Sequence, residues 1–402
     1  MSLKCKTVEL KTIANVIMGQ SPKSEFYNEN FEGMPFLQGN KTFGDKYPSF
    51  ELYTTSIKKV AEKSSVLMSV RAPVGDLNIA KEDICIGRGV CGLQMKKGDN
   101  EFLYYLLKAN ILHLINKESG TVFGSINKND IETFEVTLPG DSKDQMKILT
   151  ILKNIDKKIE VNKELNKNLE EQILKIFDSW FFKFDLSSEF VESSLGLIPK
   201  GWKVDNLGSK RSCSIIGSGI EDFDNQKIYI ATADVDNTVI TNNETLITLE
   251  DKPNRANMQP IEKSIWFAKM INSRKLIIVD NFCQDLLNNY IFSTGFCGLK
   301  CKEDCFYYLW TFLLTNTFDT IKNNFCTGTT MQAINNKDTK LIEFVIPPTQ
   351  ILSKFNKIAE PIYKEIYYNN LEIKNLQKLR NTLLPKLMSG EIDVSKINCD
   401  LE

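Results

Sequence analysis

The sequence predicts an α+β protein in which two mixed α/β domains, related by internal duplication, are joined by two long antiparallel coiled-coil helices. Two observations predict this fold class. The first is a pair of long apolar stripes with coiled-coil spacing, one at 148–180 and one at 351–387. The second is a set of short motifs that occurs once in each half of the chain, in the same order. Duplication of a unit made of one domain and one long helix explains both observations.

The first globular domain is expected over residues 8–139. Short β-branched runs broken by Gly, Pro and Asn alternate there with one helical stretch, Phe102–Lys117, which is typical of a mixed α/β domain. The single histidine of the chain, His113, falls in this apolar helical stretch, so we interpret it as a packing residue rather than a catalytic one.

The first long helix is expected between Asp144 and Lys183, a stretch without Pro or Gly. Seam positions recur in alternating steps of four and three residues, which indicates a coiled coil. The seam consists of Ile148, Leu152, Ile155, Ile159, Asn162, Asn166, Leu169, Ile173, Ile176 and Trp180. At 1.5 Å per residue such a helix would be roughly 55 to 60 Å long.

The second long helix is expected near the C-terminus, where a stripe of similar length supplies a partner for the first. The stripe consists of Ile351, Phe355, Ile358, Ile362, Ile366, Asn369, Ile373, Leu376, Leu383 and Leu387. Asn162 and Asn166 facing Asn369 or Asn370 would fix the register of the two helices, because a buried polar pair resists sliding. The alternative is that these asparagines are solvated and have no such role.

Internal repeats support the duplication. GTVFGSINKND at 120–130 returns as GTTMQAINNKD at 328–338, and GVCGLQMK at 89–96 returns as GFCGLKCK at 295–302. Each half closes with a strand-like segment that precedes its long helix. The expected boundaries are therefore 1–142 for the first domain, 143–185 for its helix, 186–348 for a connector and the second domain, and 349–392 for the second helix.

Composition is that of an ordinary soluble protein. The chain has 402 residues, 42% hydrophobic and 25% charged, with a formal net charge of −1. No apolar run is long enough to span a bilayer and the N-terminus lacks the apolar core of a signal peptide, so we expect a cytoplasmic protein without a membrane partner. Because there is no overall basic excess, nucleic-acid binding would require local clusters of Lys and Arg.

The motif inventory contains no catalytic site. There is no P-loop, no GxGxxG after a strand and no Asn-Pro-Pro-aromatic or Asp-Pro-Pro-aromatic tetrapeptide of the kind used by amino-methyltransferases. Cys297, Cys301 and Cys305 are spaced by four, but Cys297 has a counterpart, Cys91, in a half without such a cluster. We therefore expect no catalytic residue, no metal site and no cofactor bound by this chain.

Polar and basic residues gather where a β-rich domain exposes loops. Arg reads guanine and Asn or Gln reads adenine in the major groove, while Lys and Ser position the phosphates. The alternative for each residue is a solvated loop. The candidate DNA-binding residues are Gln20, Ser21, Lys23, Gln38, Asn40, Lys41, Arg71, Arg88 and Lys128 in the first half, and Lys252, Arg255, Asn257, Lys269 and Lys337 in the second.

Several longer stretches resemble the specificity subunits of type I restriction–modification systems. They are MGQSPKSEFYNENFEGMPFLQGNKTF, LMSVRAPVGDLNIAKEDICIGRGVCGL, the helical segment from FEVTLPG to FFKFD, and the terminal LRNTLLPKLMSGEID. The resemblance implies two target-recognition domains, each reading one half of a bipartite, asymmetric DNA target. It also implies that the helices set the spacing and dock two modification subunits, that S-adenosylmethionine binds to those partners, and that restriction subunits can join the complex. In the second half, Lys269 is the basic residue nearest to the place that Arg71 has in the first.

The segment IFDSWFFKFD carries more aromatic surface than a two-helix seam encloses. We therefore interpret Phe177, Trp180, Phe181 and Phe184 as a docking surface for the modification subunit; the alternative is packing against the adjacent globular domain. For the whole chain, the alternative function is a non-catalytic scaffold whose two heads bind proteins. Such a scaffold would show no sequence preference and no steep salt dependence on duplex DNA. A self-contained modification enzyme would need a methyl-donor site, which the sequence lacks.

Overall fold

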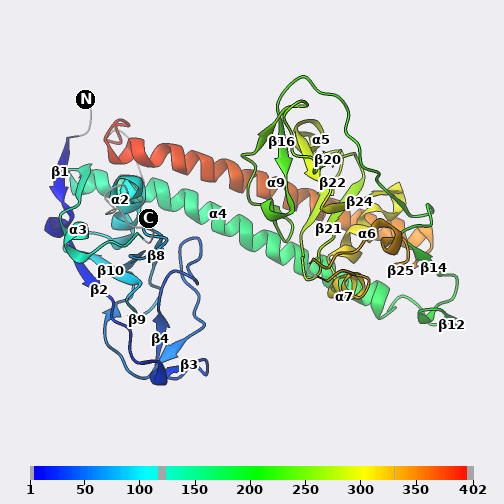
Figure 1. Ribbon diagram of the computed structural model, residues 1–402, viewed down its shortest axis with the longest axis horizontal. Coiled ribbons are helices and arrows are strands. Elements are labelled where there is room, and N and C mark those ends of the chain that lie inside the picture. The colour runs from blue at the N-terminus through cyan, green and yellow to red at the C-terminus, as the bar shows by residue number, and fades with distance from the viewer. Residues whose placement is uncertain (1–3, 116–123, 330, 396–402) are drawn as a thin grey trace. The chain divides into compact units, whose positions relative to one another are not determined.

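The computed structural model describes residues 4–115, 124–329 and 331–395 (Figure 1). The chain forms two compact units, one made of Met1–Ile159 and Lys374–Glu402 and the other of Glu160–Ile373. We call them unit 1 and unit 2. Each unit thus combines one globular domain with segments of both long helices. The start of the 120–130 motif, residue 330 in its counterpart and the first three residues of the chain lie outside the described residues.

Unit 1 contains two sheets. The first is antiparallel, with the order β2 (Ala14–Met18), β10 (Val90–Met95), β7 (Val66–Ser69) and β8 (Leu77–Ile79). Helix α2 (Asn100–Ile115) contacts this sheet (Figure 1). Its aromatic side chains, Phe102, Tyr104 and Tyr105, are buried. The second sheet has the order β3 (Tyr27–Asn28), β5 (Tyr53–Thr54), β4 (Met34–Leu37), β9 (Ile84–Ile86) and β6 (Val60–Ala61). Leu67 of β7 and Ile86 of β9 belong to one buried cluster, so the two sheets pack on each other.

Unit 2 also contains two main sheets. The first is antiparallel, with the order β15 (Cys213–Ile215), β24 (Phe296–Cys301), β21 (Ser264–Ala268) and β22 (Leu276–Val279). It is followed by α6 (Phe306–Leu313) and α7 (Asn316–Asn324). The second has the order β19 (Leu246–Ile247), β16 (Lys227–Ile230), β23 (Tyr290–Ser293) and β20 (Ala256–Met258).

Smaller elements complete both units. In unit 1, β1 (Cys5–Glu9) pairs with β11 (Glu135–Pro139). In unit 2, β14 (Lys203–Asn206) pairs with β25 (Glu343–Ile346), β12 (Phe190–Ser193) with β13 (Gly196–Pro199), and β17 (Val235–Asp236) with β18 (Val239–Ile240). The short helices are α1 (Leu10–Ile13), α3 (Lys128–Glu132), α5 (Gln284–Asn289) and α8 (Asn336–Thr339).

The two long helices were expected from the seam pattern, and both are present. Helix α4 (Ser142–Phe177) has 36 residues and is extended by a π-helical turn, Asp178–Phe182, and α9 (Thr349–Met388) has 40. At 1.5 Å per residue they are about 54 and 60 Å long. Helix α4 begins where the side chain of Asp141 accepts the Lys143 N–H, and α9 ends before Gly390, which has a φ of +76°. Every position of the two predicted seams is buried or half-buried. Neither these helices nor any other helix among the described residues is long and apolar enough to cross a membrane.

Asparagine pairs fix the register of the helices within unit 2. Asn166 accepts a hydrogen bond from Asn369 and donates one to Asn370, both at 2.9 Å. One turn earlier in α4, Asn162 donates to Glu372 at 2.7 Å, so the two helices run antiparallel here. Asn162 and Asn369 are only 1% and 6% exposed. The predicted pairing of Asn166 is confirmed, whereas the partner of Asn162 is a carboxylate rather than an amide.

These pairs predict how the helices respond to substitution. Replacing Asn166 with Leu should lower the free energy of unfolding by about 1–3 kcal/mol, because buried Asn369 loses its acceptor. Replacing Asn166 and Asn369 together should recover part of that loss, because no polar group is then left unpaired. A double-mutant cycle measured by chemical denaturation tests this. If Asn166→Leu alone is neutral, the pair does not hold the register.

Candidate DNA-binding site

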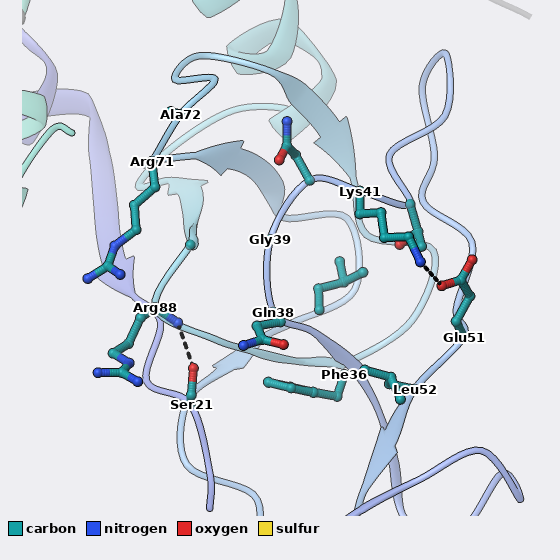
Figure 2. A pocket seen from close by; sticks show the side chains of 14 residues that line it. Ser21, Phe36, Gln38, Gly39, Lys41, Glu51, Leu52, Arg71, Ala72 and Arg88 are labelled. Carbon is teal, nitrogen blue, oxygen red and sulfur yellow. Dashed lines mark hydrogen bonds and ion pairs between the residues drawn. The ribbon is translucent and has the colours of Figure 1, made fainter. Parts of the chain in front are cut away.

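A hollow of about 540 Å³ in unit 1 brings together six of the predicted DNA-binding residues (Figure 2). Its lining includes Ser21, Gln38, Asn40, Lys41, Arg71 and Arg88. These residues come from four separate stretches of the sequence, so the fold rather than chain proximity assembles them. Gln20 and Lys23 flank Ser21 in the exposed loop beside the hollow and are not part of its lining.

Parallel pairing of β4 and β9 places Gln38 beside Arg88. Phe36 pairs with Cys85 and Leu37 with Ile86, so both chains leave the sheet at the same edge. The exit loops remain bonded, because the N–H of Gly89 donates to the Gln38 carbonyl at 3.1 Å. A Cβ at position 89 would lie 2.6 Å from that carbonyl oxygen, so this close approach requires glycine. The Gly-Arg-Gly sequence at 87–89 is the signal of this contact.

The two arginines of the hollow are exposed and unpaired. Figure 2 shows the side chains of Arg71 and Arg88 extending on the same side of the hollow, with Gln38 near its centre. The backbone of Arg88 is held by its N–H, which donates to Ser21 Oγ at 3.1 Å. Within the described residues neither guanidinium has a carboxylate partner. Each therefore keeps its full set of donors for an external acceptor.

Other candidates in this region are already engaged. The ammonium of Lys41 lies 2.9 Å from a carboxylate oxygen of Glu51, whose hydrogen bond and charge raise the pKa of Lys41. The side chain of Asn40 donates to Asp76 at 2.5 Å. Lys23 lies 3.7 Å from Glu25, and Lys128, on the first turn of α3, lies 3.4 Å from Glu132. Glu51 and Asp76 carry no sequence signal as partners, because they are distant in sequence from the residues that they bind.

In unit 2, three of the predicted residues gather around the loop at Thr294. Lys269 donates to the Thr294 carbonyl at 3.1 Å, and the Thr294 N–H donates to the Arg255 carbonyl at 2.9 Å. Lys252 donates to the carbonyl of Ala256, so both lysines are engaged with the backbone, while the Arg255 side chain is exposed. Asn257 is half-buried two residues beyond Arg255. Lys337 lies apart on the first turn of α8 and is exposed.

The position in unit 2 that has the backbone pairing of Arg71 is occupied by Met270. Arg71 forms a β-bridge with Ser125, and Met270 forms the matching bridge with Ala333. Lys269 instead makes the backbone contact that buried Val70 makes in unit 1. Each residue donates its N–H to the carbonyl of the glycine that directly precedes a neighbouring strand, β10 in unit 1 and β24 in unit 2. An exposed methionine, 42% accessible, therefore stands where unit 1 presents a guanidinium. Lys269, the basic residue expected nearest to this place, thus precedes the equivalent of Arg71 by one residue.

The aromatic segment at the end of α4 differs from the expected docking surface. Phe177 is fully buried and Phe181 is 3% exposed. The ring of Phe177 lies 5.3 Å from Tyr308, and Phe181 lies 5.1 Å from Phe355. Trp180 and Phe184 are half-buried. The alternative, packing against the neighbouring globular domain, describes Phe177 and Phe181, because α6 of that domain supplies surface that a count of the two long helices omits.

The cysteine cluster is buried in the core of unit 2. Burial raises the pKa of the Cys297 thiol to about 12, and burial also raises the pKa values of Cys301 and Cys305. The thiolate form that binds metals is therefore disfavoured at all three positions. Among the described residues, no group of three or more His, Cys, Asp and Glu side chains has a metal-binding arrangement.

A family model described as the type I restriction modification DNA specificity domain matches residues 3–171. The type I restriction enzyme MjaIX specificity subunit of Methanocaldococcus jannaschii is 30% identical over 353 residues, which cover 84% of this chain and 80% of that protein. The chain belongs to the specificity subunits of type I restriction enzymes. A second protein of that organism, provisionally assigned as the MjaX specificity subunit, is 43% identical over 168 residues, which cover 40% of this chain and only 39% of that protein.

A solved structure agrees with this membership at the level of the fold. The S subunit of a type I restriction–modification system from M. genitalium matches with a TM-score of 0.60, at 17% identity and over 96% of both chains. The α+β class with two long helices is thus confirmed. As a specificity subunit, the chain is a non-catalytic component whose function is recognition of a DNA sequence, which excludes the self-contained modification enzyme and the scaffold that binds only proteins.

Proposed function

We propose that each globular domain of this specificity subunit reads one half of a bipartite, asymmetric DNA target. The long helices set the spacing between the half-sites and dock two modification subunits. S-adenosylmethionine binds to those subunits, and restriction subunits can join the same cytoplasmic complex. The observation that carries the proposal is the hollow of unit 1, where two unpaired guanidiniums and an exposed amide converge beside two glycines.

The chemistry of the hollow matches the edges of bases. Arg71 and Arg88 can each donate two parallel hydrogen bonds to the O6 and N7 atoms of guanine, and Gln38 can both donate to and accept from adenine. Contacts with phosphates need charge alone. Lys23, in a loop, and Lys128, on α3, can supply it by breaking weak surface ion pairs. The hollow is therefore suited to reading bases, with the flanking lysines positioning the backbone.

Independent reading by two domains is supported by their like construction. The sheet order β2-β10-β7-β8 in unit 1 has the same connectivity as β15-β24-β21-β22 in unit 2. Asn127 caps α3 by accepting from Asp130, and Asn335 caps α8 by accepting from Asp338, at equivalent places in the two motifs. Like scaffolds with different exposed side chains, such as Arg71 against Met270, would read different sequences. We infer that the two domains arose by duplication and then diverged at their loops.

Exchanging residues 200–348 for the matching segment of another specificity subunit tests this function. Methylated bases mapped across the genome should show one half of the target changed and the other half unchanged, because each half is read by one domain. The unexchanged chain and a chain with its own segment reinserted serve as controls. Loss of both halves in a folded chimera, or a target that stays the same, would contradict separate reading.

A further inference from the structure

An apolar hairpin follows the end of α4, and several of its large apolar side chains stay exposed in the described part of the chain. Strands β12 and β13 form this hairpin, and it carries a concentration of exposed apolar side chains. Six large apolar residues between positions 182 and 197 are 38–58% exposed: Phe182, Leu186, Phe190, Val191, Leu195 and Leu197. A concentration of exposed large apolar side chains of this kind often marks an interaction site.

The register of the hairpin gives it one inner and one outer face. Val191 pairs with Ile198 and Glu192 with Leu197, and directly opposed residues share a face. Ile198 is 4% exposed and belongs to the core of unit 2, so the face that it shares with Val191 is directed inward, although Val191 itself is 40% exposed. Leu197, 58% exposed, and Glu192 therefore occupy the outer face. Phe190 lies on that face too and rests against Phe184 at 6.2 Å.

The hairpin is held rigidly although its own two strands are short. The Ser193 hydroxyl donates to the Gly196 carbonyl at 2.6 Å and accepts the N–H of Leu195 at 3.1 Å. Lys200 and Glu189 close its base with an ion pair of 2.8 Å. Leu195, 45% exposed, occupies the tip, where turns usually carry Gly, Asn or Asp. Because the turn already holds this leucine in place, the hairpin loses little conformational entropy when a partner covers it.

We propose that this hairpin is a docking site for the modification subunit of the complex. Its outer face combines leucine and phenylalanine with the acidic Glu192, and Lys183 and Lys200, which precede and follow the hairpin in the sequence, are paired with Asp178 and Glu189. Such a face repels phosphate and suits an apolar protein surface that carries a basic residue. This inference rests on the proposed function, which requires a separate methyltransferase chain. The hairpin belongs to unit 2, so a subunit held there is attached to the domain that reads the second half-site.

A second copy of this chain fits the site less well. Of the six side chains, the five that do not lie on the inner face expose roughly 450 Å² in total, so a symmetric pair would bury about 900 Å², less than the 1,200–2,000 Å² of a stable interface. A larger partner that continues onto neighbouring elements meets the requirement.

The test uses the full chain and the modification subunit of the same system. Replacing Leu195 with Ser and Leu197 with Glu should weaken binding of that subunit roughly 100-fold or more, because these are the two most exposed large apolar side chains of the hairpin. The matched control replaces Val239 with Ser and Leu246 with Glu, residues of unit 2 that are 45% and 56% exposed elsewhere. It should change the affinity less than about threefold. An unchanged affinity of the hairpin variant, or an equal loss in the control, overturns the proposal.

Hydrogen exchange of the wild-type chain provides a measurement that does not depend on a variant folding. Adding the modification subunit should slow exchange at the amides of residues 190–197. The assignment is overturned if these amides show no protection, or if only a restriction subunit protects them. It is also overturned if the chain associates with itself through the hairpin. The proposed function fails separately. If the wild-type complex methylates DNA without sequence preference, the proposed sequence reading is wrong. If methylation is sequence-specific and the hairpin variant fully retains it, only the proposed docking site is refuted.

Discussion

Replacing Gln38 and Arg88 with alanine is expected to abolish recognition of one half of the DNA target and to leave reading of the other half intact. Both side chains are exposed in the hollow of unit 1, and Arg88 has no carboxylate partner among the described residues. A good bidentate contact contributes about 1–3 kcal/mol of discrimination between bases, so losing two should reduce specificity roughly 10² to 10⁴-fold. The hydrogen bonds that join the two loops use backbone atoms of Gln38 and Arg88 and none of their side-chain atoms, so the fold should survive.

Lys41→Ala is the matched control for this variant. Lys41 lines the same hollow, but its ammonium is already paired with Glu51. Its removal should change specificity less than about fivefold, because an exposed ion pair contributes little and the cation is not directed at an external group. Genome-wide mapping of methylated bases and duplex-DNA binding at several salt concentrations measure both effects. Equal losses for Lys41→Ala and the double variant would show that the hollow acts through charge alone rather than by reading bases.

The long helices could be predicted from the sequence because their determinants are local. A seam recurring every three or four residues identifies α4 and α9 without reference to any other part of the chain. Even the cross-helix contact at Asn166 could be anticipated, since an amide in an apolar seam needs a polar partner and the second stripe has Asn369 near its middle. The partner of Asn162 could not, because Glu372 lies outside the predicted stripe.

The hollow of unit 1 was predictable only as separate residues. Its assembly depends on parallel pairing of β4 with β9, and nothing local in two short strands specifies which neighbour they choose or in which direction. The sequence is equally uninformative about the side chains that pair with candidate DNA-binding residues and so make them unavailable to DNA. Glu51 and Asp76 lie 10 and 36 residues from the groups that they bind, and no periodicity links them. Sequence pattern can therefore name polar residues in loops, while three-dimensional pairing decides which remain available to DNA.

The aromatic segment after α4 shows why a seam count overestimates exposed surface. Two positions per heptad is the capacity of one helix facing one partner. At this end α4 faces α9 and also the globular domain, so Phe177 and Phe181 pack on Tyr308 of α6 as well as on Phe355 of α9. A helix that leaves a coiled coil and enters a domain core needs aromatic residues around more of its circumference.

Phe177→Ala is therefore expected to destabilise unit 2 rather than to disrupt subunit docking. The ring is fully buried and lies within 6 Å of Phe181, Tyr308 and Phe355, so its removal leaves a cavity in a rigid aromatic cluster. Such truncations cost about 3–5 kcal/mol.

This loss of stability should lower the unfolding temperature by roughly 6–20 °C, as measured by calorimetry. Phe182→Ala is the control, because this adjacent ring is 38% exposed and should cost less than about 1 kcal/mol. Hydrogen exchange should show the loss of protection centred on α6 and the first half of α9, both of which belong to unit 2. If Phe177→Ala instead left the unfolding temperature unchanged and lost only the modification subunit, the segment would be a docking surface after all, and the burial of its ring would have to be relieved in the assembled complex.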